Sequence, residues 1–263
     1  MKKLDLTQVH NRLLSIAINV DKICSKHDIP LFMISGTMLG AIRHYGFIPW
    51  DDDMDFAVPY EHYDKLINVL KDELPEHLRC LTYNISETYK IPWIKVEDIN
   101  TKAIDNCLNL PMDKMPGINI DIFPLVNCHK DNCDIVRKIQ RWIKIKRYVY
   151  AKSNKDNSRF KNIIKYTISA IFPISQTYIC NRIMTLTDSI PKGDHYIIPM
   201  DPNYSNRYFS RQWFEPLTKY KFEDYVFYGA ADYDNYLRYL YNNYMNLPPL
   251  ESRRIHCDNI YSL

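Results

Sequence analysis

The chain has 263 residues, of which 46% are hydrophobic and 25% charged, and it carries a net charge of only +3. This length allows one large domain or two small ones with a sizeable core, and the small net charge implies no general affinity for nucleic acid or other polyanions. The seven cysteines include no Cys-x-x-Cys pair. A disulfide framework and a zinc site are therefore disfavoured, and a reducing cytoplasm is the expected location.

The N-terminal part predicts a helix, a short strand and a second helix. Apolar residues recur there at helical spacing: Leu6, Leu13, Ala17, Val20 and Cys24. This spacing indicates an amphipathic helix of the mature protein and not a signal peptide. A short apolar strand at 31–34 ends in the turn Ser35-Gly36-Thr37, and a helix is expected from Met38 to about His44. No segment reaches the roughly 20 apolar residues that a membrane span requires.

Four aspartates crowd the run Asp51-Asp52-Asp53-Met54-Asp55, and the apolar residues 56–58 follow it. Two like charges about 4 Å apart repel by roughly 1 kcal/mol in water and by several times more near a protein surface. If the run is extended, Asp51, Asp53 and Asp55 share one face and Asp52 points away. Converging carboxylates of this kind are typical of a magnesium or manganese site.

Two other kinds of structure could account for this run. A solvated acidic loop stays open as the plainer one. An EF-hand calcium loop also begins Asp-x-Asp-x-Asp, but it needs Gly at its sixth position and Glu at its twelfth. This chain has Phe56 and His62 there, so the EF-hand is rejected.

The rest of the chain predicts an α+β (mixed α/β) fold in a single domain with a helical C-terminal half. A helix is expected from Tyr60 to about Leu74. Short strands are expected around 78–83, 92–97, 102–104 and 119–124, and the last of these carries a lone Asp121. The pattern is helical from Asp131 to about Asp188, and a Tyr-rich helix is expected from Asp232 to Met245.

The segment 137–165 is strongly basic, with eleven Lys and Arg residues against the single Asp156. A solvated helix face is the ordinary explanation. The alternative is a peripheral contact with an anionic membrane, at its inner face, because basic and apolar groups together bind anionic lipid. Nucleic acid is disfavoured as a partner, since no recognition motif accompanies the charge.

Three pieces of the sequence can be combined into one site: the Ser35-Gly36-Thr37 turn, the pair Asp53 and Asp55, and Asp121. A Gly-Thr turn before a helix offers backbone N–H groups and a hydroxyl to a phosphate. Two carboxylates on one face hold a divalent ion, and a third completes the cage or takes the proton from an attacking hydroxyl. Such an arrangement is typical of metal-assisted phosphoryl-type transfer.

At this point the sequence resembles a known family. The segment 36–55, Gly-Thr-Met-Leu-Gly-Ala-Ile-Arg-His-Tyr-Gly-Phe-Ile-Pro-Trp-Asp-Asp-Asp-Met-Asp, resembles the signature of the LicD family of phosphorylcholine transferases and fukutin-type relatives. The stretches 95–102, 120–125 and 241–254 resemble further motifs of that family. The resemblance implies a nucleotidyltransferase-like fold, a small mixed sheet flanked by helices. Its core would span about 28–126, and a helical and C-terminal part about 131–263.

The chain departs from the family pattern near its C-terminal end. Asn242-Asn243 stands where the family commonly has Gly-Asp, and His256-Cys257 where it often has a His pair. His256 is accordingly both a candidate site residue and a candidate packing or surface histidine.

The resemblance also implies a reaction. A phospho-headgroup such as phosphocholine would pass from a CDP-activated donor such as CDP-choline to a hydroxyl of a cell-surface glycan, of lipopolysaccharide, capsule or teichoic acid type, with release of CMP. The family pattern places the catalytic and metal-binding carboxylates for Mg²⁺ or Mn²⁺ at Asp53, Asp55 and Asp121.

The same resemblance assigns the donor contacts. Gly36 and Thr37 would line the phosphate turn, and Arg43 and Lys95 are candidate phosphate contacts because guanidinium and ammonium groups suit phosphate oxygens. Surface or ion-pairing roles stay open for both cations. Two other functions are carried alongside: a nucleotidyltransferase that moves NMP from an NTP to a small molecule or sugar, and a non-enzymatic binding module, which the retained carboxylates disfavour.

Overall fold

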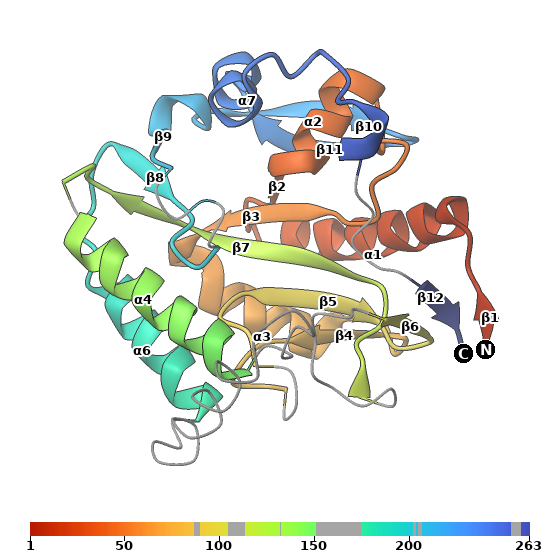
Figure 1. Cartoon of the computed structure of the whole chain (residues 1–263), viewed down its shortest axis with the longest axis horizontal. Helices are drawn as coiled ribbons and strands as arrows, with labels where there is room; N and C mark the ends of the chain where they lie inside the picture. The colour runs from red at the N-terminus through yellow and green to blue at the C-terminus, as the bar shows by residue number, and fades with distance from the viewer. Residues whose placement is uncertain are drawn as a thin grey trace.

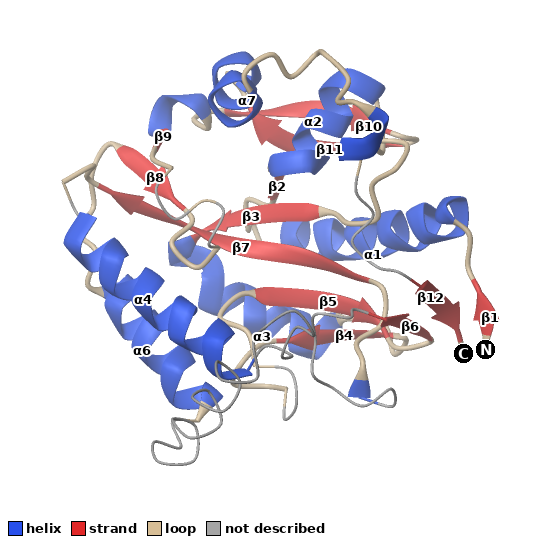
Figure 2. Ribbon diagram, viewed as in Figure 1, coloured by secondary structure: helices blue, strands red, loops and turns tan. Residues whose placement is uncertain are grey.

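The computed structural model describes residues 1–86, 90–104, 114–131, 133–150, 175–201, 204, 207–253 and 259–263. Within these ranges the chain forms an α+β fold with a mixed sheet and six α-helices (Figures 1 and 2). The predicted fold class is therefore confirmed. None of the helices in this described part is long and apolar enough to cross a bilayer.

The helices are α1 (Leu6–Lys26), α2 (Ser35–His44), α3 (Tyr63–Glu73), α4 (Cys133–Tyr150), α6 (Gln176–Asp188) and α7 (Tyr233–Tyr241). Short 3₁₀ turns span Tyr60–His62, Arg211–Trp213 and Leu250–Ser252. The strands are β1 (Lys2–Lys3), β2 (Phe32–Met33), β3 (Asp55–Pro59), β4 (Leu78–Leu81), β5 (Ile94–Asp98), β6 (Thr101–Ile104), β7 (Asn119–Cys128), β8 (His195–Ile197), β9 (Phe209–Ser210), β10 (Leu217–Phe222), β11 (Tyr225–Ala230) and β12 (Asn259–Ser262).

The main sheet has the strand order β10-β11-β2-β3-β7-β5-β4, and β8 and β9 extend it beside β7. The pairs β3–β7 and β2–β11 are parallel, and the other pairs are antiparallel. Strands β1, β12 and β6 form a separate small sheet, which brings the two ends of the chain side by side (Figure 1). The long β7 therefore lies near the middle of the main sheet, beside β3.

The apolar pattern of the first helix produces the expected packing. Leu13, Ala17, Val20 and Cys24 are buried on one side of α1, which contacts α3, β5 and β7. The side chain of Asp5 caps the helix by accepting a hydrogen bond from the Gln8 N–H at 2.8 Å, which satisfies a backbone donor that the helix itself leaves unpaired. This helix is the support on which β5 and β7 rest.

The second half of the chain is not only helical, contrary to the expectation. It contributes β8 to β11, and β11 pairs with β2 in the main sheet. The β10–β11 hairpin turns at Glu223, whose φ of 53° is left-handed. Left-handed turns usually contain Gly or Asn, so this turn carries no ordinary hairpin signal in the sequence. The Tyr-rich helix is also shorter than expected, since α7 ends at Tyr241, and residues 151–174 of the predicted helical region lie outside the described residues.

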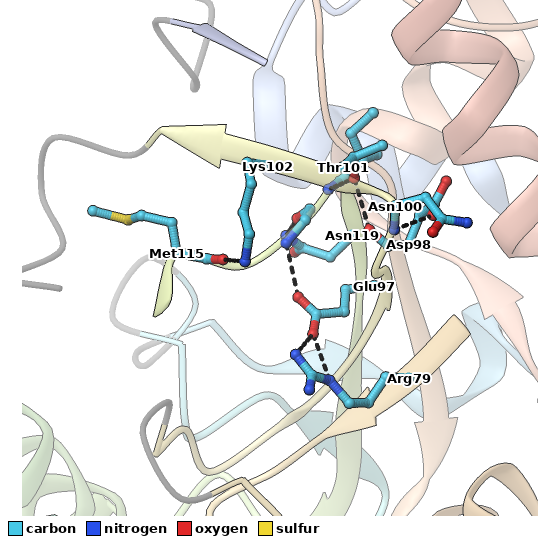
Figure 3. A network of polar contacts seen from close by, with 10 residues as sticks. Arg79, Glu97, Asp98, Asn100, Thr101, Lys102, Met115 and Asn119 are labelled. Atoms are coloured by element: carbon cyan, nitrogen blue, oxygen red, sulfur yellow. Dashed lines mark hydrogen bonds and ion pairs between the residues drawn. The ribbon is translucent and has the colours of Figure 1, made fainter. Parts of the chain in front are cut away.

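A polar network fixes the entry into β7 (Figure 3). The carboxylate of Glu97, only 1% exposed, accepts hydrogen bonds from Arg79 at 2.5 and 2.8 Å and from the Gly117 N–H at 2.8 Å. The hydroxyl of Thr101 accepts from the Ile118 N–H at 2.8 Å. These contacts anchor the chain just before β7 and so set the position of Asp121.

The network predicts unequal effects of its two charged partners on stability. Replacing Glu97→Ala leaves the buried Gly117 N–H without its acceptor, and we expect the free energy of unfolding to fall by about 2 kcal/mol. Replacing Arg79→Ala leaves the Glu97 carboxylate, only 1% exposed, without its cation, and we expect a larger loss of about 3–5 kcal/mol because the charge that remains is buried. Urea denaturation of both variants checks this, and equal losses would contradict the assignment.

Candidate active site

Asp55 and Asp121 are direct neighbours across the parallel pair β3–β7. The Asp121 N–H donates to the Met54 carbonyl at 2.9 Å, and residues in register on parallel strands point to the same face of the sheet. Burial, followed by the charges of Asp53, Asp121 and Asp201, raises the pKa of Asp55 well above its usual range, and Lys95 opposes this shift. Two acids that are distant in sequence therefore share one electrostatic environment.

The acidic run itself lies mostly ahead of the strand, because β3 begins only at Asp55. The expected alternation is still visible in the burial: Asp52 is buried at 6% exposure, whereas Asp51, Asp53 and Asp55 are partly exposed. Burial and the charges of Asp53 and Asp52 raise the pKa of Asp51 to about 8. The three alternate aspartates thus interact as a set, with Asp53 influencing both of the others.

Contacts to the backbone hold this run in place. The Nε2 atom of His10 lies 2.6 Å from the Asp51 carbonyl oxygen, and the His10 ring stacks on Phe47 with centroids 4.0 Å apart. The Thr37 hydroxyl accepts a hydrogen bond from the Asp55 N–H at 2.8 Å. Because these contacts use main-chain atoms, they position the run without occupying its carboxylate oxygens.

Lys95 brings a cation into the cluster from β5. It stands opposite Asp121 in the antiparallel register, and its Nζ lies 2.6 Å from Asp121 Oδ1 and 2.8 Å from Asn119 Oδ1. The indole N–H of Trp93 donates to the same Asp121 oxygen at 2.9 Å. The Lys95 side chain is only 12% exposed, so its charge is held against the carboxylates and not in bulk solvent.

The first turn of α2 faces the same region. The helix begins at Ser35, earlier than the sequence indicated, and Ser35 has a left-handed φ of 54°. A Cβ atom on Gly36 would stand 3.1 Å from Asp51 Oδ2, so glycine allows a close approach between helix and acidic run. The Ser35 N–H donates to the Tyr236 hydroxyl at 3.0 Å. The Ser35 Oγ is buried and is the one such side-chain atom in the described residues without a partner at hydrogen-bond geometry, although it interacts with the hydroxyls of Tyr204 and Tyr236.

Arg43 is engaged elsewhere. It lies in the last turn of α2, where its Nη1 donates to the Tyr244 carbonyl at 2.7 Å and contacts the Asn246 carbonyl at 3.4 Å. These contacts tie the segment after α7 to α2. The role of Arg43 as a donor phosphate contact stays a prediction. In the structure, Arg43 has the separate role of holding the segment after α7.

The structure also places residues here that the sequence did not single out. Asp201, just after β8, raises the pKa of Asp55. Tyr204 and Tyr241 interact with each other and with Asp55, and Tyr241 also with Asp51. Tyr241 begins the stretch 241–254 that resembles a family motif, but no motif marks Asp201 or Tyr204, and a chain with 21 tyrosines gives no reason to choose these two. His256 lies outside the described residues.

The chemistry of this donor set suits a hard divalent cation, because carboxylate oxygens are the ligands that Mg²⁺ and Mn²⁺ prefer. The mutual repulsion of Asp51, Asp53, Asp55 and Asp121, offset by Lys95, favours added positive charge. Within the described residues, however, no three His, Cys, Asp or Glu side chains already stand as a metal cage. An ion would therefore be held first by Asp53 and Asp55, with Asp121 shared with Lys95.

The raised pKa of Asp51 predicts a pH-dependent stability in the presence of a chelator. The usual value is 3.8 and the folded value about 8, so the folded state binds the extra proton. Its stabilising effect is complete below about pH 4 and is lost as pH rises through about 8. Urea unfolding across this range should show falling stability, with a weaker slope in Asp51→Asn. The exposed Asp72→Asn serves as control and should keep the wild-type slope; an unchanged slope in Asp51→Asn contradicts the prediction.

Comparison with known proteins relates the chain to one family. Residues 28–148 match the family model described as LicD/FKTN/FKRP, nucleotidyltransferase domain. The lipopolysaccharide cholinephosphotransferase LicD of Haemophilus influenzae is 28% identical over 279 aligned residues, which cover 97% of each chain. An uncharacterized protein of Rickettsia typhi is 38% identical over 53 residues, covering 19% of this chain and 17% of its own length. The resemblance to the LicD family is thereby confirmed, and residues 28–148 are the part of the chain that matches the family model.

Proposed function

We propose that this chain is a metal-dependent phosphotransferase that moves phosphocholine, or a similar phospho-headgroup, from a CDP-activated donor to a hydroxyl of a lipopolysaccharide-type glycan. The observation that carries the proposal is the side-by-side placement of Asp55 and Asp121 on β3 and β7, next to Asp53. The headgroup and acceptor are chosen because the relative aligned along its whole length is named a lipopolysaccharide cholinephosphotransferase.

The acceptor hydroxyl must lose a proton as it attacks the phosphorus next to the headgroup. Asp121 is our candidate for the proton acceptor. The contacts from Lys95 and Trp93 both go to its Oδ1 and so fix the orientation of the carboxylate. Its other oxygen, Oδ2, is then the atom directed at the attacking hydroxyl.

The donor phosphates would lie between Lys95 and the first turn of α2. Lys95 supplies an ammonium group, and the helix N-terminus supplies partial positive charge and backbone donors. The buried Ser35 Oγ, which has no partner at hydrogen-bond geometry in the described residues, is our candidate for the hydroxyl contact. Thr37, the contact expected from the sequence, already accepts from the Asp55 N–H.

Asp53 and Asp55 would hold Mg²⁺ or Mn²⁺, and Asp121 would be either their third ligand or the proton acceptor, because Lys95 and Trp93 already contact its Oδ1. When bound, the ion would neutralise charge on the donor phosphates and on the leaving CMP. The chain's own contribution is to keep these carboxylates close together through the β3–β7 pairing and to keep their oxygens exposed enough to reach a ligand.

Turnover measured with CDP-choline, a lipopolysaccharide acceptor and magnesium tests the proposal. We expect release of CMP, and a loss of about a thousandfold or more in Asp53→Asn or Asp55→Asn, because each removes a charge that the reaction needs. Asp72→Asn is the matched control and should retain activity. Circular dichroism should show that all three variants are folded. Activity retained in Asp53→Asn and Asp55→Asn would refute the site.

A second prediction separates Ser35 from Thr37. Ser35→Ala should leave folding stability unchanged or slightly higher, because it removes a buried hydroxyl without a partner at hydrogen-bond geometry, while KM for the donor rises about tenfold. Thr37→Val should instead lower the free energy of unfolding by about 1–2 kcal/mol, because the Asp55 N–H loses its acceptor. Steady-state kinetics and urea denaturation of both variants check this. A Ser35→Ala variant with normal KM and reduced stability would show that Ser35 is only structural.

The second candidate reaction is nucleotidyl transfer from an NTP, which the description of the matched family model as a nucleotidyltransferase domain favours. The same carboxylates would serve either reaction, so the product decides between them. Pyrophosphate released from CTP or another NTP would support nucleotidyl transfer, and CMP released from CDP-choline supports the proposal above.

A further inference from the structure

The helix pair α4–α6 has an outer side that the proposed reaction does not use. Figure 1 shows this pair at the lower left, away from α2 and α7 at the top. Its inner side is apolar, with Val136, Ile139 and Ile143 of α4 packed with Ile179 and Ile183 of α6 in a cluster that includes residues of β7 and β8. These inner contacts explain why the two helices pack together. They do not explain which residues lie on the outer side of the pair.

The positive charge of the chain is concentrated on α4. This helix has six basic residues and a single acidic one, Asp134. The whole chain has 34 basic and 31 acidic residues, so the part outside α4 has 28 basic and 30 acidic residues. Such asymmetry is typical of a surface that meets an anionic partner.

The basic side chains form one stripe. Arg137, Lys138, Arg141 and Lys144 are all exposed and recur at the three- and four-residue spacing that places side chains on one side of a helix. Asp134 pairs with Arg137 at 2.5 Å, which offsets one of these charges. Lys146 is only partly exposed and lies off the stripe.

Apolar and aromatic groups border the stripe. Ile145 is 37% exposed and Tyr178 of α6 is 51% exposed. The Trp142 ring meets the Tyr178 ring edge-on, with centroids 6.0 Å apart. Rings of this kind have an apolar body and a polar end, which suits them to the boundary between lipid headgroups and acyl chains.

We propose that this surface docks on an anionic lipid bilayer. We call it the basic face: Arg137, Lys138, Arg141, Trp142, Lys144, Ile145 and Tyr178. Its cations match the negative headgroups, and its exposed Ile145 and Tyr178 gain by entering the acyl boundary. A nucleic acid would use the same cations, but an aliphatic side chain adds nothing to contacts with a phosphate backbone. The inference concerns a surface apart from the candidate active site and does not depend on the proposed reaction.

The test is cosedimentation of the full chain, without substrates, with phosphatidylcholine vesicles that contain about one third phosphatidylglycerol. We expect binding to these vesicles and none to pure phosphatidylcholine, with release as salt rises from about 0.05 M to about 0.5 M. The variant with Arg137→Gln, Lys138→Gln, Arg141→Gln and Lys144→Gln should bind at least about tenfold more weakly. The double variant Ile145→Ser with Tyr178→Ser should also bind more weakly, with its net charge unchanged.

The matched control removes four exposed lysines elsewhere: Lys22→Gln, Lys71→Gln, Lys192→Gln and Lys221→Gln. It has the same net charge as the four-residue variant and should bind vesicles like the wild type. Equal loss in both would overturn the proposal, as would no binding at low salt. Preferential binding of single-stranded RNA, lost in the basic-face variant but insensitive to Ile145→Ser with Tyr178→Ser, would also overturn it. Asp53→Asn should keep full vesicle binding, so failure of the proposed reaction and failure of docking are distinguishable.

Discussion

The parallel pairing of β3 with β7 is the constraint on which the site depends, because it places Asp55 beside Asp121. Like charges about 4 Å apart repel by roughly 4 kcal/mol near a protein surface. Packing alone does not require them, since the apolar residues 56–58 and the neighbouring residues of β7 already bury the two strands. The fold therefore holds these carboxylates close together although they repel one another. Lys95, at 2.6 Å from Asp121, offsets only part of that repulsion.

Three contacts around the acidic run hold its backbone. His10 lies against the Asp51 carbonyl, Thr37 accepts from the Asp55 N–H, and the Asp121 N–H donates to Met54. The carboxylates also interact with one another and with Lys95, whose Nζ lies 2.6 Å from Asp121 Oδ1. Main-chain contacts thus help to set where the carboxylates lie, and one cation offsets part of their repulsion.

Local patterns were enough to predict part of this arrangement. Alternation along 51–55 agrees with the burial of Asp52 between its partly exposed neighbours, because side-chain direction in an extended chain depends only on adjacent residues. The register that joins Asp55 to Asp121, and Asp121 to Lys95, could not be predicted. The sequence of one strand does not indicate which distant strand it pairs with, or in which register. Arg43 shows a second limit of prediction from sequence. A guanidinium suits phosphate and carbonyl oxygens alike, and the structure directs it to the carbonyls of Tyr244 and Asn246.

The later part of the chain is bound into the site and is not an appendage. The Tyr236 hydroxyl accepts from the Ser35 N–H, β11 pairs with β2, and Arg43 fixes the segment after α7. These contacts meet at α2, whose first turn faces the carboxylates. Since α2 lies within the matched span 28–148 and its partners lie outside it, the shape of the first turn of α2 depends on both parts. A site built from both parts can be shared only by relatives that align over both. The relative from Haemophilus influenzae does so, since its alignment covers 97% of each chain.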